Sequence, residues 1–122
     1  MKRFTSIVAC CLPLLGLAPA RAERAFNVQG VAGACRLANG VLTIHDNGKV
    51  SLTARVASSS NGSDAYCLTF QFQDGNGTQV FQWPMICSQT LYPVWQTWAR
   101  DNLAVPQNTV NVIQRISWTN HC

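Results

Sequence analysis

The chain has 122 residues, of which 11% are charged, and its formal net charge at pH 7 is +4. This length allows a single domain of ordinary size. Three of the nine basic residues precede residue 23, which leaves six basic against five acidic residues, and that balance excludes both the basic surface of a nucleic-acid binder and the polybasic run that binds anionic lipid.

The first 22 residues have the pattern of a secretory signal peptide. Lys2 and Arg3 form a basic start, residues 7–17 form an apolar run, and Ala20-Arg21-Ala22 fits the small-x-small cleavage rule. We therefore predict cleavage after Ala22 and a secreted or periplasmic location. Because the apolar run is too short to span a bilayer, we expect no stable membrane insertion after cleavage.

The mature chain is predicted to be one secreted β domain over residues 23–122. It contains no internal repeat, linker or low-complexity segment that would divide it. Lipoprotein processing at Cys10 is an alternative fate for the leader, since residues 7–10 loosely resemble a lipobox.

Four cysteines follow the predicted signal: Cys35, Cys67, Cys87 and Cys122. In an exported domain of this size they predict two disulfides, for which three connectivities exist. A hairpin centred near residues 75–76 would bring Cys67 close to Cys87, so we favour Cys67–Cys87 and Cys35–Cys122 while the other pairings stay open. With no CxxC motif and only two histidines, we expect no redox centre, metal or cofactor.

Alternating apolar and polar residues predict strands along most of the mature chain. In residues 49–57, for example, Val50, Leu52 and Ala54 alternate with polar side chains, which is typical of a strand with one buried and one solvated face. Asn-Gly and Asp-Gly pairs, which supply the positive φ of tight turns, separate several of these runs. The predicted strands cover residues 25–30, 40–46, 49–58, 65–73, 78–84 and 109–119.

One helix is predicted over about residues 90–103, because Leu91, Trp95 and Trp98 follow helical spacing. Pro93 is tolerable in a first helical turn, and Pro106 would end the element. The expected fold is therefore mainly β: an antiparallel meander of five to six strands, curled into a small barrel or sandwich, with this helix packed on it and two disulfides.

The run GACRLANGVLTIHDNGKVSLTARVASSSNGSDAY, followed at a distance by Trp118 and Cys122, resembles a group of small secreted bacterial β-domains of unknown function. The resemblance rests on four features: Gly33-Ala34-Cys35, the turn Asp46-Asn47-Gly48, the alternating strand 50–56, and Asp64-Ala65-Tyr66. It implies a β fold and export. It implies no activity, because the group has none to transfer.

Candidates for catalysis are few. The chain lacks a G-x-S-x-G nucleophile elbow. His45 and Asp46 could form a base and its orienting carboxylate, but neighbours in a strand point to opposite faces. Asp46 and Asp74 close hairpins of the same sense, which keeps a carboxylate pair or a weak Ca²⁺ site as a hypothesis. We assign no catalytic residue, and a small hydrolase is the least favoured function.

The candidate ligand-binding residues are aromatic and amide side chains. Tyr92, Trp95 and Trp98 would share one face of the predicted helix, while Gln71 and Gln73 belong to a polar, almost uncharged sheet face. Exposed aromatic rings and amides suit a glycan or another neutral polar ligand. The competing interpretation is that the helix aromatics cover the sheet, just as alternation directs Trp118 toward the core.

The expected function is that of an exported, disulfide-stabilised, non-catalytic binding module, acting on a glycan or other polar ligand. The alternative is an inhibitor or immunity-type protein, which binds another protein through a rigid loop such as residues 58–64 or 74–77. A monomer is expected in either case.

Overall fold

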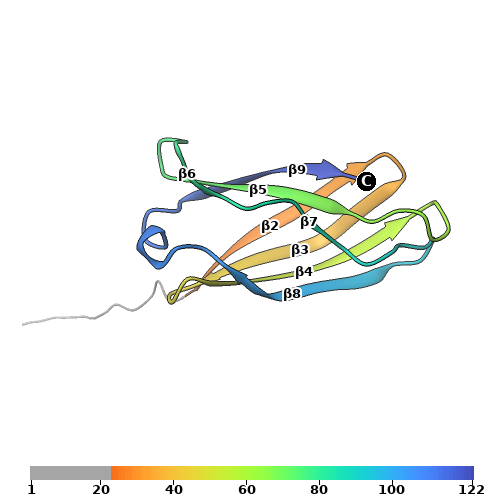
Figure 1. The fold of residues 1–122 in the computed structure, drawn as a ribbon, viewed down its shortest axis with the longest axis horizontal. Helices are drawn as coiled ribbons and strands as arrows, with labels where there is room; N and C mark the ends of the chain where they lie inside the picture. The colour runs from red at the N-terminus through yellow and green to blue at the C-terminus, as the bar shows by residue number, and fades with distance from the viewer. Residues whose placement is uncertain (1–22) are drawn as a thin grey trace, which may run out of the picture.

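Residues 23–122, the part of the chain described by the computed structural model, form two antiparallel sheets that lie in two layers around one core (Figure 1). The predicted signal peptide, its cleavage motif and Cys10 lie outside the described residues. The mainly β prediction is confirmed.

The first sheet has four strands, each longer than most strands of globular proteins. Its order is β2 (Glu23–Ala32), β3 (Cys35–His45), β4 (Lys49–Ser58) and β8 (Gln96–Ala104). The β3–β4 hairpin turns at Gly48, where φ is 89° and the backbone N–H donates to the His45 carbonyl at 2.9 Å. Only glycine takes such a φ without strain, so the Asn-Gly turn signal was informative here.

The second sheet is built around β5 (Cys67–Gln73). On one side β5 pairs with β6 (Gln79–Gln82) and then β7 (Ile86–Cys87), and on the other side with β9 (Arg115–His121). A short 3-10 helix, η2 (Gln107–Thr109), lies on the connection from β8 to β9.

The side chain of Trp83 joins the two sheets. The ring of Trp83 packs edge-on against Phe72, with centroids 4.8 Å apart, and against Phe70 at 5.7 Å. Its indole N–H donates to the carbonyl of Ala104 at 2.6 Å, so the second sheet is bonded to the end of the first. Such pairs add specific geometry to the burial of large apolar surface.

Both predicted disulfides are confirmed. Cys67 bonds to Cys87, directly opposite it across the β5–β7 ladder. Cys35, at the start of β3, bonds to Cys122 at the end of the chain. The two bonds fit a non-reducing compartment. Among the described residues, no helix has the length and hydropathy to cross a membrane.

The predicted helix at about residues 90–103 is wrong. A tight turn with a bridge between Tyr92 and Val94 is followed by β8, which pairs with β4 from Val56 to Lys49. The physical reason is that β4 needs a second partner, and a ladder of backbone hydrogen bonds outweighs a weak helical spacing interrupted by Pro93.

The predicted meander of five to six strands is also corrected. After β4 the chain crosses at residues 59–66 to the other sheet, so β4 and β5 do not pair. The strand predicted at 109–119 begins only at Arg115, and the turn before it buries Val110 and Ile113 but exposes Val112. Arg24 holds this turn, because its guanidinium donates to the carbonyls of Ile113 and Val110.

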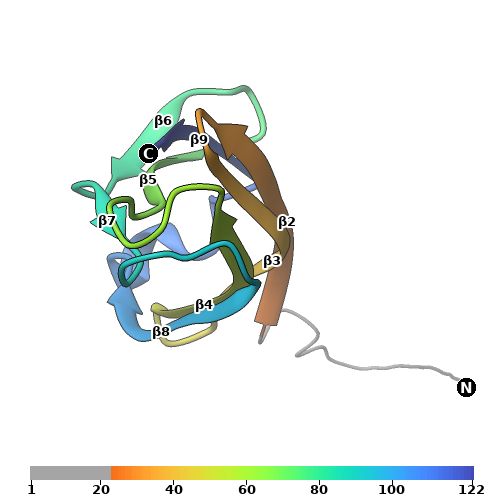
Figure 2. The same cartoon turned by 90° about the vertical axis from the view of Figure 1, so that its right-hand side faces the viewer.

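The sheets approach each other along β2 and β9 without closing into a barrel. Seen end-on, the strands surround the core and the end of β2 lies beside β9 (Figure 2). No β-ladder joins these two strands within residues 23–122. Instead the indole N–H of Trp118 donates to the carbonyl of Gln29 at 3.2 Å. We call this open junction the seam.

Candidate functional site

A cavity of about 550 Å³ opens at the seam. Three amide side chains and one indole ring dominate its lining, which we call the seam pocket: Asn27, Val28, Gln29, Asn39, Gly40 and Trp118. None of these side chains is charged. The volume falls in the range that small-molecule sites occupy.

Irregularities in two ladders shape the seam pocket. The β2–β3 register shifts between Val28 and Gly30, and the β3–β4 register shifts around Asn39 and Gly40. Asn39 has φ of +53°, a conformation that asparagine tolerates better than most residues. A Cβ at Gly40 would lie 2.4 Å from the Val28 carbonyl oxygen, so the strands can approach this closely only at glycine. Such bulges redirect side chains and recur beside functional sites.

The polar groups of the seam pocket are available to a ligand. The side-chain amides of Asn27, Gln29 and Asn39 make no hydrogen bond to another protein group in the described part of the chain. Each amide offers two donors and an acceptor. Trp118, in contrast, is fixed by its bond to Gln29 and by packing against Phe70, with ring centroids 6.4 Å apart. The pocket therefore combines a held aromatic wall with free amides.

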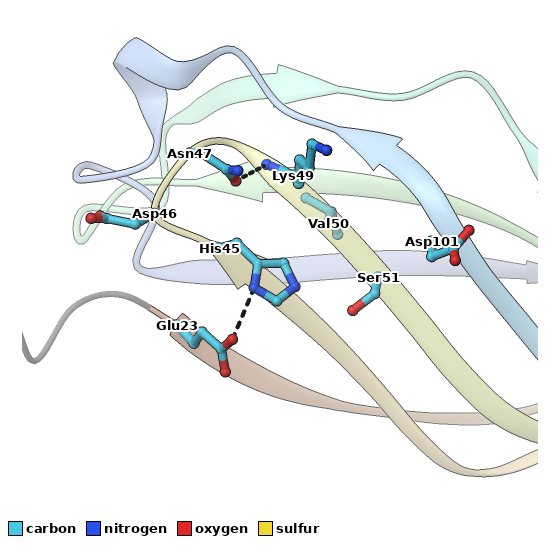
Figure 3. Close-up of a pocket in the computed structure, with 8 residues that line it drawn as sticks. All are labelled: Glu23, His45, Asp46, Asn47, Lys49, Val50, Ser51 and Asp101. Atoms are coloured by element: carbon cyan, nitrogen blue, oxygen red, sulfur yellow. Dashed lines mark hydrogen bonds and ion pairs between the residues drawn. The ribbon is translucent and has the colours of Figure 1, made fainter.

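A second cavity, of about 440 Å³, lies on the outer face of the first sheet near the β3–β4 hairpin (Figure 3). Its lining is mostly charged or polar: Glu23, His45, Asp46, Asn47, Lys49, Val50, Ser51 and Asp101. Glu23 lies opposite His45 in the β2–β3 register, and its Oε2 is 3.0 Å from Nδ1 of the imidazole. The other ring nitrogen faces toward Ser51 (Figure 3).

The carboxylate that orients His45 is thus Glu23, where the sequence suggested Asp46. A base with its orienting carboxylate still needs a nucleophile and oxyanion donors. Within residues 23–122 no hydrogen bond joins Ser51 to His45, and Ser51 is paired to Thr43 in the β3–β4 ladder, which engages the backbone there. The arrangement can accept a proton but does not position an acyl-transfer reaction.

The carboxylate pair suggested by sequence finds no support as an ion site. The Asp74 side chain stabilises the turn in which it lies. Its Oδ1 accepts hydrogen bonds from the backbone N–H groups of Asn76 and Thr78 at 2.9 and 3.0 Å. Asp46 belongs to a hairpin of the other sheet. Among the described residues, the only group with metal-ligand proximity is Cys35, Asp64 and Cys122. Both of its sulfurs are consumed by the disulfide, so they are not thiolate ligands.

The predicted ligand-binding residues are not brought together. Trp98 is 3% exposed and belongs to the core, where it offers nothing to a ligand. Gln71 and Gln73 lie on the outer face of the second sheet, and both side chains are hydrogen-bonded to the hydroxyl of Ser117, at 3.3 and 3.4 Å.

Tyr92 and Trp95 remain accessible beside the first sheet. Their exposed fractions are 45% and 40%. The ring of Tyr92 covers Gly62, where an added Cβ would be 3.1 Å from Tyr92 Cε1. The guanidinium of Arg36 lies over the Trp95 ring, 5.0 Å from its centroid, which is a cation–π arrangement.

A buried phenol lies near the seam pocket. Burial raises the pKa of Tyr66 to about 12, so the hydroxyl is a neutral donor at physiological pH. It donates to Oδ1 of Asn120 at 2.7 Å. Tyr66 therefore contributes structure at the seam and no charge.

Sequence reasoning missed the seam pocket. Asn27, Gln29 and Asn39 look like ordinary outward-facing residues, and Trp118 was expected in the core, against which one side of it does pack. One signal was present: Asn39-Gly40 interrupts an alternating run, and such a pair inside a strand indicates a bulge.

One family model, described as a family of unknown function (DUF6294), matches residues 41–122. The match confirms the resemblance to a family of small β domains without known activity, and it begins after Asn39 and Gly40. No curated protein and no solved structure matches the chain significantly.

Proposed function

Because the chain belongs to a family of unknown function, DUF6294, we propose its role from the geometry of its own surface: an exported, non-catalytic protein that binds a neutral glycan in the seam pocket. The observation that carries this proposal is the lining of the pocket, in which free amides surround a fixed indole.

The chemistry of the lining selects the ligand class. Sugar hydroxyls are both donors and acceptors, and the amides of Asn27, Gln29 and Asn39 offer both functions without charge. The apolar face of a sugar ring has a matching surface in the indole of Trp118. Because no charged group lines the pocket, a phosphorylated or acidic ligand would gain no ion pair there.

The pocket is preformed, which favours binding. Trp118 is held by its hydrogen bond to the Gln29 carbonyl. The Cys35–Cys122 disulfide fixes the end of β9, the strand that carries the indole. A ligand therefore orders few protein groups when it binds, which lowers the entropic cost of association.

The Glu23–His45 cavity supports the non-catalytic part of the proposal. Its imidazole has an orienting carboxylate but no aligned nucleophile. Its lining groups are mostly charged or polar and most are solvent-exposed, so they lack the water-excluded environment in which electrostatic catalysis is strong. We propose export from the leader pattern, and the two disulfides, which fit a non-reducing compartment, support this proposal.

The test is a screen of the mature protein on an array of neutral glycans, followed by calorimetric titration of the best binder. Asn39→Gly is the cleanest variant, because glycine keeps the positive φ and removes only the amide. Loss of its hydrogen bonds should weaken binding by about tenfold, which corresponds to ~1.4 kcal/mol.

Trp95→Ala is the control, since Trp95 is an exposed aromatic residue that does not line the seam pocket. It should bind the glycan as the wild type does. The proposal fails if no neutral glycan binds, or if Asn39→Gly binds normally while Trp95→Ala does not.

A further inference from the structure

Exposed apolar side chains concentrate at one end of the first sheet. Of the seven large hydrophobic residues that are exposed within residues 23–122, four lie at this end: Val31 is opposite Arg36 in the β2–β3 ladder, and Tyr92, Val94 and Trp95 belong to the turn that leads into β8. We call this group the loop-end surface: Val31, Arg36, Tyr92, Val94 and Trp95. Val31 and Val94 are the most exposed of the four, at 67% and 60%.

The strand register explains why these residues meet. Arg36 lies opposite Val31 on β2 and opposite Ala57 on β4. On the far side of β4, Val56 pairs with Gln96, so Trp95 comes next to Ala57. Ala57 is only 2% exposed, whereas Arg36, its partner in the ladder, is exposed and stacks on Trp95.

The guanidinium of Arg36 is available to a partner. No ion pair joins Arg36 to a carboxylate within residues 23–122. Stacking on Trp95 holds the guanidinium in place while its edge keeps its N–H donors. A guanidinium presented in this way is suited to bidentate recognition of a carboxylate.

The loop-end surface is also rigid. The hydroxyl of Ser58 donates to Asp64 at 2.8 Å, which closes the loop of residues 59–63 at its base. The backbone N–H of Ser58 donates to the carbonyl of Tyr92 at 3.1 Å, and that of Gly62 to the carbonyl of Leu91 at 3.0 Å. These bonds hold the turn that contains Tyr92 and Val94 against the loop of residues 59–63, so the surface is preformed for a partner.

We propose that the loop-end surface docks a protein segment that presents a carboxylate beside an apolar side chain. Tyrosine, tryptophan and arginine are the residues that dominate binding energy at protein interfaces. The surrounding Ser-Asn-Gly loop has the composition of antibody binding loops, in which rigid aromatic anchors are combined with adaptable polar groups. The apolar segment covers Val94 and Trp95, and its carboxylate pairs with Arg36.

This surface shares no residue with the seam pocket, so the docking inference does not depend on the glycan proposal. A glycan is the less suitable occupant here, because Arg36 covers one face of the Trp95 ring on which a sugar would stack.

The test is to select peptides from a random display library on the immobilised mature protein. The affinities of the enriched peptides are then measured by calorimetry. Enriched peptides should carry Asp or Glu next to an aromatic or aliphatic residue. Arg36→Glu should weaken their binding by at least about tenfold, since an attraction becomes a repulsion. Trp95→Ala should do the same by removing the anchor.

Arg55→Glu is the matched control, because Arg55 lies on the same outer sheet face but makes no cation–π contact within residues 23–122. It should leave binding unchanged. If Trp95→Ala does not fold, as judged by circular dichroism, Arg36→Glu decides alone. The proposal is overturned if the library yields no acidic–apolar consensus, if the peptides bind Arg36→Glu as well as wild type, or if Arg55→Glu weakens them equally.

Discussion

The hydroxyl of Tyr66 donates a hydrogen bond of 2.7 Å to Oδ1 of Asn120, and this bond joins the segment before β5 to the end of β9. Gly30 of β2 lies directly against both groups. Three segments distant in sequence therefore meet at one partly buried hydrogen bond beside the seam, and the position of β9 relative to β2 depends on it.

Replacing Tyr66 with phenylalanine should lower the free energy of unfolding by about 1–2 kcal/mol, because the partly buried Oδ1 of Asn120 loses its donor. Urea unfolding at neutral pH measures the change. Asn120→Ala supplies the second arm of a double-mutant cycle, and strictly additive losses would show that the two side chains do not interact.

The same phenol predicts a loss of stability in alkaline solution. Its pKa is raised from 10.0 to about 12 in the folded protein. Between these values the unfolded chain has lost a proton that the folded chain retains, so the Tyr66 contribution is complete below pH 10 and declines as the pH rises toward 12. Urea midpoints measured across this window should fall more steeply for wild type than for Tyr66→Phe. Parallel curves would contradict the assignment.

Gly30→Ala should be strongly destabilising. The new Cβ would lie 2.5 Å from Asn120 Oδ1 and 2.7 Å from the Tyr66 hydroxyl, so the hydrogen bond must move. We expect a loss of about 2–3 kcal/mol in the free energy of unfolding. Gly75→Ala is the control, because its Cβ would only touch Gln114 Cγ at 3.7 Å. It should stay within about 0.5 kcal/mol of wild type. Equal effects would disprove the close contact.

The two disulfides should contribute unequally. Cys35–Cys122 closes a loop with a sequence separation of 87, and Cys67–Cys87 one of 20. On the chain-entropy model, removing the first by paired Cys→Ser substitution should cost about 4–5 kcal/mol and removing the second about 3 kcal/mol. Chemical denaturation of both double variants measures the order, and a larger loss for the short loop would refute this account.

Much of the fold could be predicted from local pattern. Alternation located the central strands, because a half-buried strand imposes period two on its side chains. Cys67 and Cys87 could be paired because a hairpin brings them together. The segment around Trp98 could not be assigned correctly, because the spacing of its apolar residues fits a helix. It forms a strand because β4 needs a second partner in the sheet.

The candidate sites were less accessible to prediction. The seam pocket joins Asn27 to Asn39 through a bulge and then to Trp118 from the other sheet, and no local pattern encodes that meeting. Glu23 and His45 likewise meet through strand register. Tyr92 and Trp95 were correctly singled out as unusual, but the features that distinguish them are the stacked Arg36 and the turn that replaces the predicted helix.

The most direct measurement of the central claim is an NMR titration of the ¹⁵N-labelled mature protein with the best glycan from the array. We predict that the side-chain NH₂ signals of Asn27, Gln29 and Asn39 and the indole N–H signal of Trp118 shift together and saturate at one ligand per chain. Shifts confined to Trp95 and its neighbours, or no saturating shift at the seam, would contradict a glycan site between β2 and β9.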